Sequence, residues 1–137
     1  MYEYQHTHRV RYRECDPMGI VYHAHYVDYF EAARTEMIRA FGIPYSEIER
    51  RGHLIQVTQV NVRYHSPVFY DDELTITVRV DEVPKMRFTI QNEVRRTGED
   101  KLLASGRVEL CFVDAASKRP IRVPEYFVSV LKEYVTT

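Results

Sequence analysis

The sequence lacks several features that would point to specialised protein classes. Its 137 residues include no tryptophan and only two cysteines, Cys15 and Cys111, which form neither a CxxC pair nor a metal-type spacing. A disulfide framework and a cysteine-based metal site are therefore not indicated, and a Cys15–Cys111 disulfide remains a disfavoured alternative. We expect a protein of the reducing cytoplasm.

Long apolar runs and an excess of either charge are also missing. No segment approaches the roughly 20 apolar residues of a membrane-spanning helix, and residues 1–12 lack the apolar core of a signal peptide. The 19 basic and 20 acidic residues give a net charge of -1. This balance argues against nucleic-acid binding driven by bulk charge. We expect neither a membrane span nor a nucleic-acid partner.

The composition is that of an ordinary folded domain. Hydrophobic residues make up 45% and charged residues 28% of the chain, with no internal repeat, low-complexity segment or linker. A chain of this length buries about two-thirds of its unfolded surface on folding. We predict one domain over residues 1–137.

One long helix is expected, over Tyr26–Phe41. Its apolar residues recur at helical spacing and form one stripe, and Gly42 and Pro44 follow as helix breakers. The members of the stripe are Tyr26, Tyr29, Phe30, Ala33, Met37, Ala40 and Phe41. Ser46 and Glu49 resemble a capping box, which predicts a short second helix to about Arg51.

Most of the remaining chain alternates between polar and apolar residues, as half-buried strands do. The expected strands are 4–12, 54–64 with a bulge near Gln59, Leu74–Val80, Phe88–Val94, Leu102–Val113 and a short Ile121–Val123. Pro124 should open a C-terminal helix with an apolar side formed by Tyr126, Phe127, Val130, Leu131 and Tyr134.

The short turns between the later strands require antiparallel neighbours. The long helix would measure about 24 Å, close to the about 23 Å of a seven-residue strand. One antiparallel sheet can therefore wrap lengthwise around one helix, which is an α+β architecture.

Asp16 is the first candidate for chemistry. It lies between a strand end and the start of the long helix, in a turn with Pro17 and Gly19. An aspartate in such a turn is most often only a turn residue. The helix N-terminus just downstream, however, presents unpaired N–H groups that suit a developing oxyanion.

Three further proton-handling residues lie close to Asp16 in the sequence, namely Tyr12, His23 and His25. Each of them taken alone is more often a structural residue. A zinc site is not indicated, because no third ligand has suitable spacing.

The order of these residues resembles a known signature. The run CDPMGIVY at 15–22, with Tyr26 and Ala32 after it, is similar to that of the 4-hydroxybenzoyl-CoA thioesterase family. Tyr12, HAHY at 23–26 and EAARTE at 31–36 look most like its bacterial acyl-CoA thioesterase branch, whose best-known members are associated with the Tol–Pal system. The YDDEL turn at 70–74 and the order of elements match as well, so the resemblance extends to about Pro124.

The resemblance implies a hotdog fold, with a curved antiparallel sheet around a central helix. It also implies hydrolysis of acyl-CoA without a metal or other cofactor, in a homodimer or homotetramer whose subunits share active sites. Asp16 matches the catalytic carboxylate, acting as nucleophile or as general base. The backbone N–H at His23 matches the oxyanion donor, and the His23 and Tyr12 side chains match further residues of that active site.

The resemblance also suggests residues for substrate binding. Gly19, Ile20 and Val21 belong to the matched turn, and Lys85 and Arg87 lie where the hydroxybenzoyl enzyme carries basic residues near the nucleotide phosphates. This sequence is less basic there, so a solvated turn is an equal alternative for Lys85 and Arg87.

Two other functions remain as alternatives. A hotdog hydroxyacyl dehydratase would use an acid on the helix, for which Glu31 is available, but its histidine loop is absent from the sequence. A non-catalytic acyl-CoA-binding or protein-binding module on the same fold would not need Asp16. The intact Asp16 turn argues against this module. The preferred acyl group is not predicted, because one fold serves many substrates.

Overall fold

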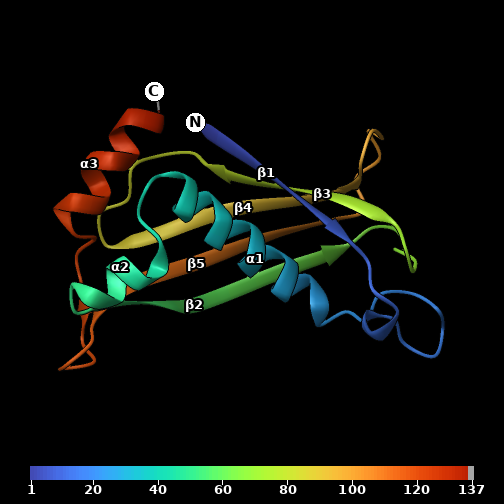
Figure 1. The fold of residues 1–137 in the computed structure, drawn as a ribbon, viewed down its shortest axis with the longest axis horizontal. Coiled ribbons are helices and arrows are strands. Elements are labelled where there is room, and N and C mark those ends of the chain that lie inside the picture. Colours follow the sequence, from blue (N-terminus) through green and yellow to red (C-terminus); the bar gives the residue numbers. More distant parts are fainter. Residues whose placement is uncertain (136–137) are drawn as a thin grey trace.

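The computed structural model describes residues 1–135, and its largest element is an antiparallel sheet (Figure 1). The five longer strands follow the order β1-β3-β4-β5-β2, and the short β6 pairs with β5. The strands are β1 Tyr2–Arg9, β2 His53–Tyr64, β3 Glu73–Val80, β4 Arg87–Arg96, β5 Ala104–Asp114 and β6 Pro120–Ile121. The predicted α+β architecture is confirmed.

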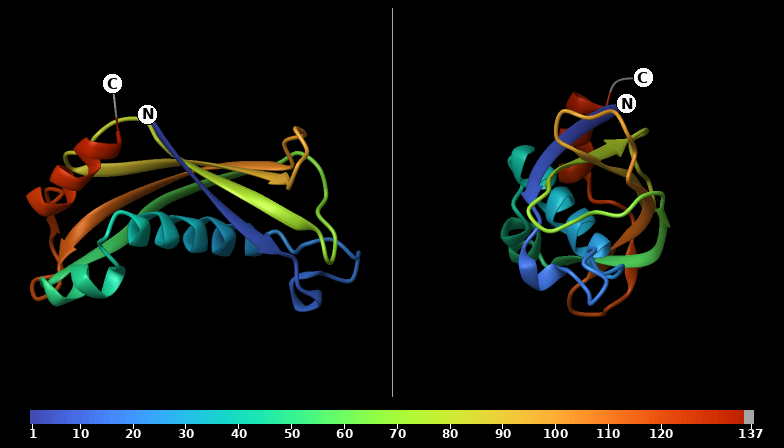
Figure 2. Two further views of the ribbon diagram at one scale, coloured as in Figure 1. Left: turned by 45° about the horizontal axis from the view of Figure 1, so that its top comes forward. Right: turned by 90° about the vertical axis from the view of Figure 1, so that its right-hand side faces the viewer.

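The sheet curves around helix α1, His25–Ala40, which runs along its length (Figure 2). Phe30, Ala33 and Met37 have no exposed surface and point into the core between helix and sheet. The predicted stripe is therefore the packing face of α1 from Tyr26 to Met37, whereas its member Ala40 is exposed and Phe41 lies just after the helix. Gly42, with φ of +88°, follows the helix in the left-handed conformation that commonly ends helices.

The bulge predicted near Gln59 is confirmed, because the pairing of β2 with β5 shifts register between Val57 and Gln59. Two strand predictions were inaccurate at their ends. The strand expected at Leu102–Val113 begins only at Ala104, and the strand expected at Ile121–Val123 is Pro120–Ile121. Val123 instead donates its N–H to the carbonyl of Lys85.

The first strand was predicted to reach residue 12, and this was wrong. β1 ends at Arg9, and the 3-10 turn η1, Tyr12–Glu14, follows. The backbone N–H of Glu14 donates to the carbonyl of Arg11 at 2.9 Å, and the Glu14 side chain accepts from the N–H of Arg11 at 2.9 Å. These two local bonds turn the chain away from the sheet.

Two short helices cover one end of the sheet, α2 Tyr45–Arg50 and α3 Glu125–Tyr134 (Figure 1). The capping box predicted at Ser46 was wrong, because Pro44 occupies the cap position and Ser46 lies inside α2. The predicted C-terminal helix is confirmed as α3, and its residues Phe127 and Leu131 are fully buried.

The order of strands leaves β1 and β2 at the two edges of the sheet. On β2, the side chains of Val57 and Val60 remain 43% and 37% exposed. Within residues 1–135, no helix is long and apolar enough to cross a membrane.

Candidate active site

A tight loop between η1 and α1 holds Asp16 at one end of the sheet. The N–H of Asp16 donates to the carbonyl of Ile20 at 2.8 Å, and the N–H of Gly19 donates to the carbonyl of Asp16 at 2.9 Å. Gly19 has φ of +80°, a conformation that residues with a Cβ adopt only with strain. The loop is closed at its base by a bridge between Cys15 and Val21.

This loop forms a hydrogen bond with only one of the two carboxylate oxygens of Asp16. Oδ1 accepts the N–H of Met18 at 2.8 Å, and Oδ2 has no hydrogen-bond partner within residues 1–135. The side chain is half-buried and lines a cavity of ≈ 430 Å³. One carboxylate oxygen is therefore oriented by the loop while the other is available to a reactant.

The cavity lies between the Asp16 loop, the start of α1 and the segment after β2. Its lining residues are Asp16, Ile20, Val21, His23, Tyr26, Tyr64, His65, Ser66 and Pro67. Sequence reasoning had singled out Asp16, Ile20, Val21 and His23 for this site, and the fold brings these four together.

The start of α1 is tied to β2 by a hydrogen bond that the sequence did not indicate. The hydroxyl of Tyr64 donates to the carbonyl of His23 at 2.9 Å, and its ring packs edge-on against Tyr26 at 5.0 Å. The N–H groups of His23 and Ala24 donate to no acceptor in the described part of the chain. Such free donors at a helix N-terminus can stabilise negative charge.

Tyr26 supplies a neutral, largely buried wall of the cavity. Burial, together with the neighbouring Tyr64, raises the pKa of Tyr26 to about 12. Tyr26 belongs to the matched signature but was not assigned a role in the site, and Tyr64 was not singled out among the 11 tyrosines. Only the tertiary structure places Tyr64, at the end of β2, beside Asp16.

Three other predicted residues lie outside this cavity. The side chain of Tyr12 is 79% exposed and packs against Tyr70, and Gly19 lies at the exposed tip of the loop. His25 turns to the other side of α1, where its Nδ1 lies 3.2 Å from Oδ2 of Asp28. Glu31, the acid that a dehydratase would use, is likewise absent from the Asp16 cavity and lines two different cavities.

Cys15, next to Asp16, is not activated as a nucleophile. Burial and the nearby charges of Glu14, Asp16 and Asp72 raise the pKa of its thiol, which disfavours the reactive thiolate. Its sulfur contacts the carbonyl of Arg11 at 4.0 Å. The Asp16 carboxylate is thus the better candidate for an anionic reactant in this loop.

Lys85 and Arg87 line a second cavity, of ≈ 550 Å³, together with Arg107 on β5 and the acidic residues Asp81 and Glu82. The side chain of Arg87 lies 3.8 Å from Glu109, a loose ion pair. This basic cluster lies at the opposite end of the sheet from the Asp16 loop (Figure 1), so one protomer does not bring the two together. Arg107 was not predicted, because on an alternating strand it resembles any exposed residue.

Metal binding has no support in the side-chain arrangement. Among residues 1–135, no group of three or more His, Cys, Asp or Glu side chains is placed to hold a metal ion.

Comparison with known proteins identifies related sequences and folds. The model of the thioesterase-like superfamily matches residues 10–131. The acyl-CoA thioester hydrolase YbgC of Escherichia coli O6:H1 is 32% identical over 127 residues, covering 91% of this chain and 92% of that protein.

Solved structures show the same fold. The DHNA-CoA thioesterase of Staphylococcus aureus superposes with a TM-score of 0.88 and 29% identity, over 98% of this chain and 89% of that chain. A 4-hydroxybenzoyl CoA thioesterase complexed with 4-hydroxybenzoyl CoA gives a TM-score of 0.86 over 95% of this chain and 99% of that one, and at 23% identity it supports the hotdog fold alone.

Proposed function

This chain belongs to the thioesterase-like superfamily, and from this premise we propose that it hydrolyses acyl-CoA thioesters to a free acid and CoA. The predicted resemblance to the 4-hydroxybenzoyl-CoA thioesterase family and its acyl-CoA branch is confirmed by these relatives. The observation that carries the proposal is the Asp16 carboxylate, oriented through one oxygen and lining a cavity at the start of α1.

The proposed chemistry needs one carboxylate and one or two N–H donors. The thioester carbonyl would accept hydrogen bonds from the N–H groups of His23 and Ala24, which polarise it and stabilise the oxyanion. Oδ2 of Asp16 then attacks the carbonyl carbon to give an anhydride and CoA thiolate, or removes a proton from an attacking water. In the first route, water hydrolyses the anhydride and regenerates Asp16.

The side chains of His23 and Tyr12 are proposed to contribute less to catalysis than Asp16. His23 contributes mainly through its backbone, since its side chain is exposed in the protomer. Tyr12 would approach a substrate only from outside the cavity, on the surface that it shares with Tyr70.

The complete site is proposed to require a second copy of the chain. Lys85, Arg87 and Arg107 would bind the CoA phosphates, but Lys85 and Arg87 lie at the start of β4, at the opposite end of the sheet from the Asp16 loop. Pairing of two protomers along their β2 edges in antiparallel fashion would bring the cluster of one towards the Asp16 cavity of the other. This requirement supports a homodimer, alone or paired into a homotetramer. The absence of a bond between Cys15 and Cys111 supports a cytoplasmic location.

The test measures thioester hydrolysis with a thiol reagent, using acyl-CoAs from acetyl to palmitoyl and benzoyl derivatives, with and without EDTA. We expect activity that survives EDTA. Asp16→Asn should lower kcat by at least about a hundredfold, because it removes the attacking or proton-accepting charge. His23→Ala should cost less, since alanine keeps the backbone N–H.

Asp28→Asn is the matched control, because Asp28 also lies at the start of α1 but faces away from the Asp16 cavity. It should leave kcat unchanged. Wild-type kcat in Asp16→Asn combined with an inactive His23→Ala would show that the wrong residue has been assigned.

A further inference from the structure

Glu14 is a buried acid that the proposed reaction does not use. Its exposed fraction is 9%, although a carboxylate in the interior is costly unless it is paired or hydrogen-bonded. Glu14 precedes Asp16 by two residues and belongs to η1, so its position bears directly on the catalytic loop.

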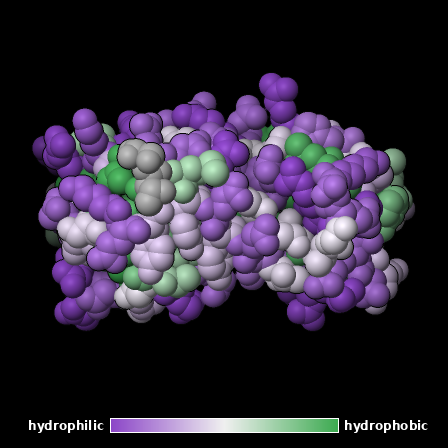
Figure 3. All heavy atoms as spheres, turned by 90° about the horizontal axis from the view of Figure 1, so that it is seen from above, coloured by the Kyte–Doolittle hydropathy of each residue, from purple (hydrophilic) through white to green (hydrophobic). Residues whose placement is uncertain are grey.

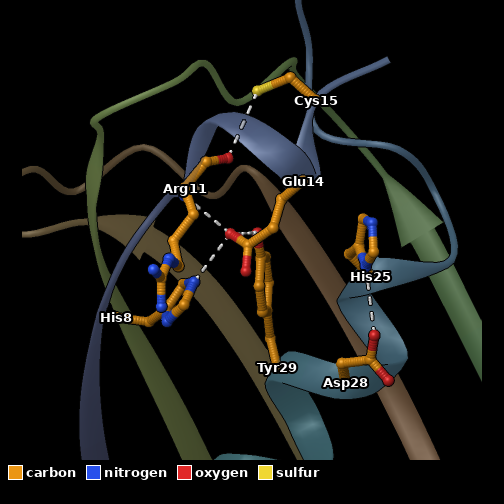
Figure 4. Close-up of polar contacts among 7 residues, drawn as sticks. All are labelled: His8, Arg11, Glu14, Cys15, His25, Asp28 and Tyr29. Carbon is orange, nitrogen blue, oxygen red and sulfur yellow. Dashed lines mark hydrogen bonds and ion pairs between the residues drawn. The ribbon is translucent and has the colours of Figure 1, made fainter.

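A single oxygen of Glu14 accepts hydrogen bonds from three separate parts of the chain (Figure 4). Oε1 accepts the Tyr29 hydroxyl of α1 at 2.9 Å and the backbone N–H of Arg11, before η1, at 2.9 Å. Nε2 of His8, on β1, lies 3.0 Å from the same oxygen and donates to it, because an ionised carboxylate only accepts. Oε1 of Glu14 therefore holds η1 against both β1 and α1.

The backbone of Glu14 holds the other end of the loop. Its carbonyl accepts the N–H of Tyr22 at 2.9 Å, one residue before His23. Residue 14 is thus bonded to the chain on both sides of the Asp16 turn. A shift of Glu14 would move Asp16 relative to the free N–H groups at the start of α1.

We propose that Glu14 is a positioning residue, whose Oε1 sets the place of the Asp16 carboxylate relative to the oxyanion donors of α1. The inference rests on the proposed role of Asp16. Correct placement of reacting groups matters strongly, because a displacement of about 1 Å can cost about a hundredfold in rate.

A direct acid–base role for Glu14 does not fit its surroundings. Its side chain faces a groove between β1 and α1, on the other side of the helix from the Asp16 cavity. The titratable side chains lining that groove are His6, His8, Arg13, His25, Asp28, Tyr29 and Glu31. Glu14 can therefore reach the reaction only through the loop that it holds.

The test compares Glu14→Ala, Glu14→Gln and Glu14→Asp, with kcat and KM measured on protein shown to be folded by circular dichroism. Glu14→Ala should lower kcat about 10- to 100-fold with KM changed less than about twofold, since the misplaced group acts in the chemical step. Glu14→Gln should retain kcat within about threefold, because its amide oxygen can accept the same bonds. Glu14→Asp is too short to reach all three donors and should resemble alanine.

Tyr29→Phe provides a second variant should Glu14→Ala fail to fold. It removes one donor to Oε1 and should lower kcat several-fold. Tyr45→Phe is its matched control, because it also loses a tyrosine hydroxyl. That hydroxyl accepts the N–H of Ile55 at 2.9 Å and lies far from the Asp16 loop. Tyr45→Phe should lose stability but keep kcat.

The outcomes separate this inference from the proposed function. Full activity in Asp16→Asn would show that Asp16 is not catalytic and would contradict the proposed function. An inactive Asp16→Asn combined with wild-type kcat in Glu14→Ala or Tyr29→Phe would overturn only the positioning role. Equal loss in Glu14→Gln and Glu14→Ala would overturn it as well, by showing that charge rather than position is required.

Discussion

At the scale of single residues, the Glu14 carboxyl also links stability to pH. Burial by itself raises its pKa, but the hydrogen bonds from His8, the Arg11 N–H and Tyr29 outweigh burial, so the pKa of Glu14 lies below its ordinary value of 4.5. The unfolded chain then binds the proton first as the pH falls. The stabilisation is present above pH 4.5 and is lost as the pH falls through the lower pKa of the folded state.

This argument predicts that Glu14→Gln flattens the acid side of the stability profile. Urea denaturation between about pH 5 and pH 3 should show a smaller loss of unfolding free energy than in the wild type, because the variant lacks the titrating group. Burial lowers the pKa of His6 below its ordinary value of 6.5, but His6 is present in both proteins, so its effect is common to the two profiles. Parallel profiles for the two proteins in this range would contradict the assignment.

At the scale of secondary-structure elements, Phe127 provides a fully buried aromatic contact between α3 and the sheet. Phe127 is fully buried, and its ring packs edge-on against Phe88 of β4 at 5.6 Å and Phe112 of β5 at 5.0 Å. These contacts lie at the end of the sheet opposite the Asp16 loop (Figure 1).

Phe127→Ala should therefore destabilise the protein by about 3–5 kcal/mol, with kcat of the folded fraction unchanged. Ser129→Ala on the exposed side of the same helix should stay within about 0.5 kcal/mol of wild type. Chemical denaturation and kinetics of the two variants provide the check. A loss of kcat in folded Phe127→Ala would show that this end of the sheet acts in the chemical step and not only in the proposed binding of CoA.

At the scale of the whole molecule, β2 is the edge best suited to join two copies. It is 12 residues long and exposes Val57 and Val60, and long exposed edges of this kind are usually covered or paired. The length of β2 and its exposed valines support the proposed homodimer. The face seen in Figure 3, from above in the view of Figure 1, is largely hydrophilic, with hydrophobic areas separated from one another.

Since the proposed site uses residues of two protomers, specific activity should fall as the protein is diluted to concentrations at which the dimer dissociates. The loss should follow the decrease of the dimer measured by light scattering, by mass action. An inert carrier protein controls for adsorption at low concentration. Constant activity in a sample shown to be the 16.3 kDa monomer would contradict the shared site.

The main elements of this fold could be predicted from the sequence because they leave local periodic signals. The stripe from Tyr26 to Phe41 repeats at helical spacing. Buried residues recur at every second position of β3 and of most of β4, although Thr77 of β3 is buried as well. The ends of elements were less predictable. At residues 10–14, the strand gave way to η1 because of two bonds between Arg11 and Glu14 that periodicity does not encode.

The sequence by itself determined the Asp16 turn, since the conformations that Asp16, Pro17 and Gly19 favour are properties of adjacent residues. Only the tertiary structure decided what surrounds that turn. It placed the Tyr64 hydroxyl on the His23 carbonyl, brought His8 and Tyr29 to Glu14, and set Lys85, just before β4, at the far end of the sheet. These contacts join residues from separate elements, and their formation depends on strand order and curvature, which no local run of residues specifies.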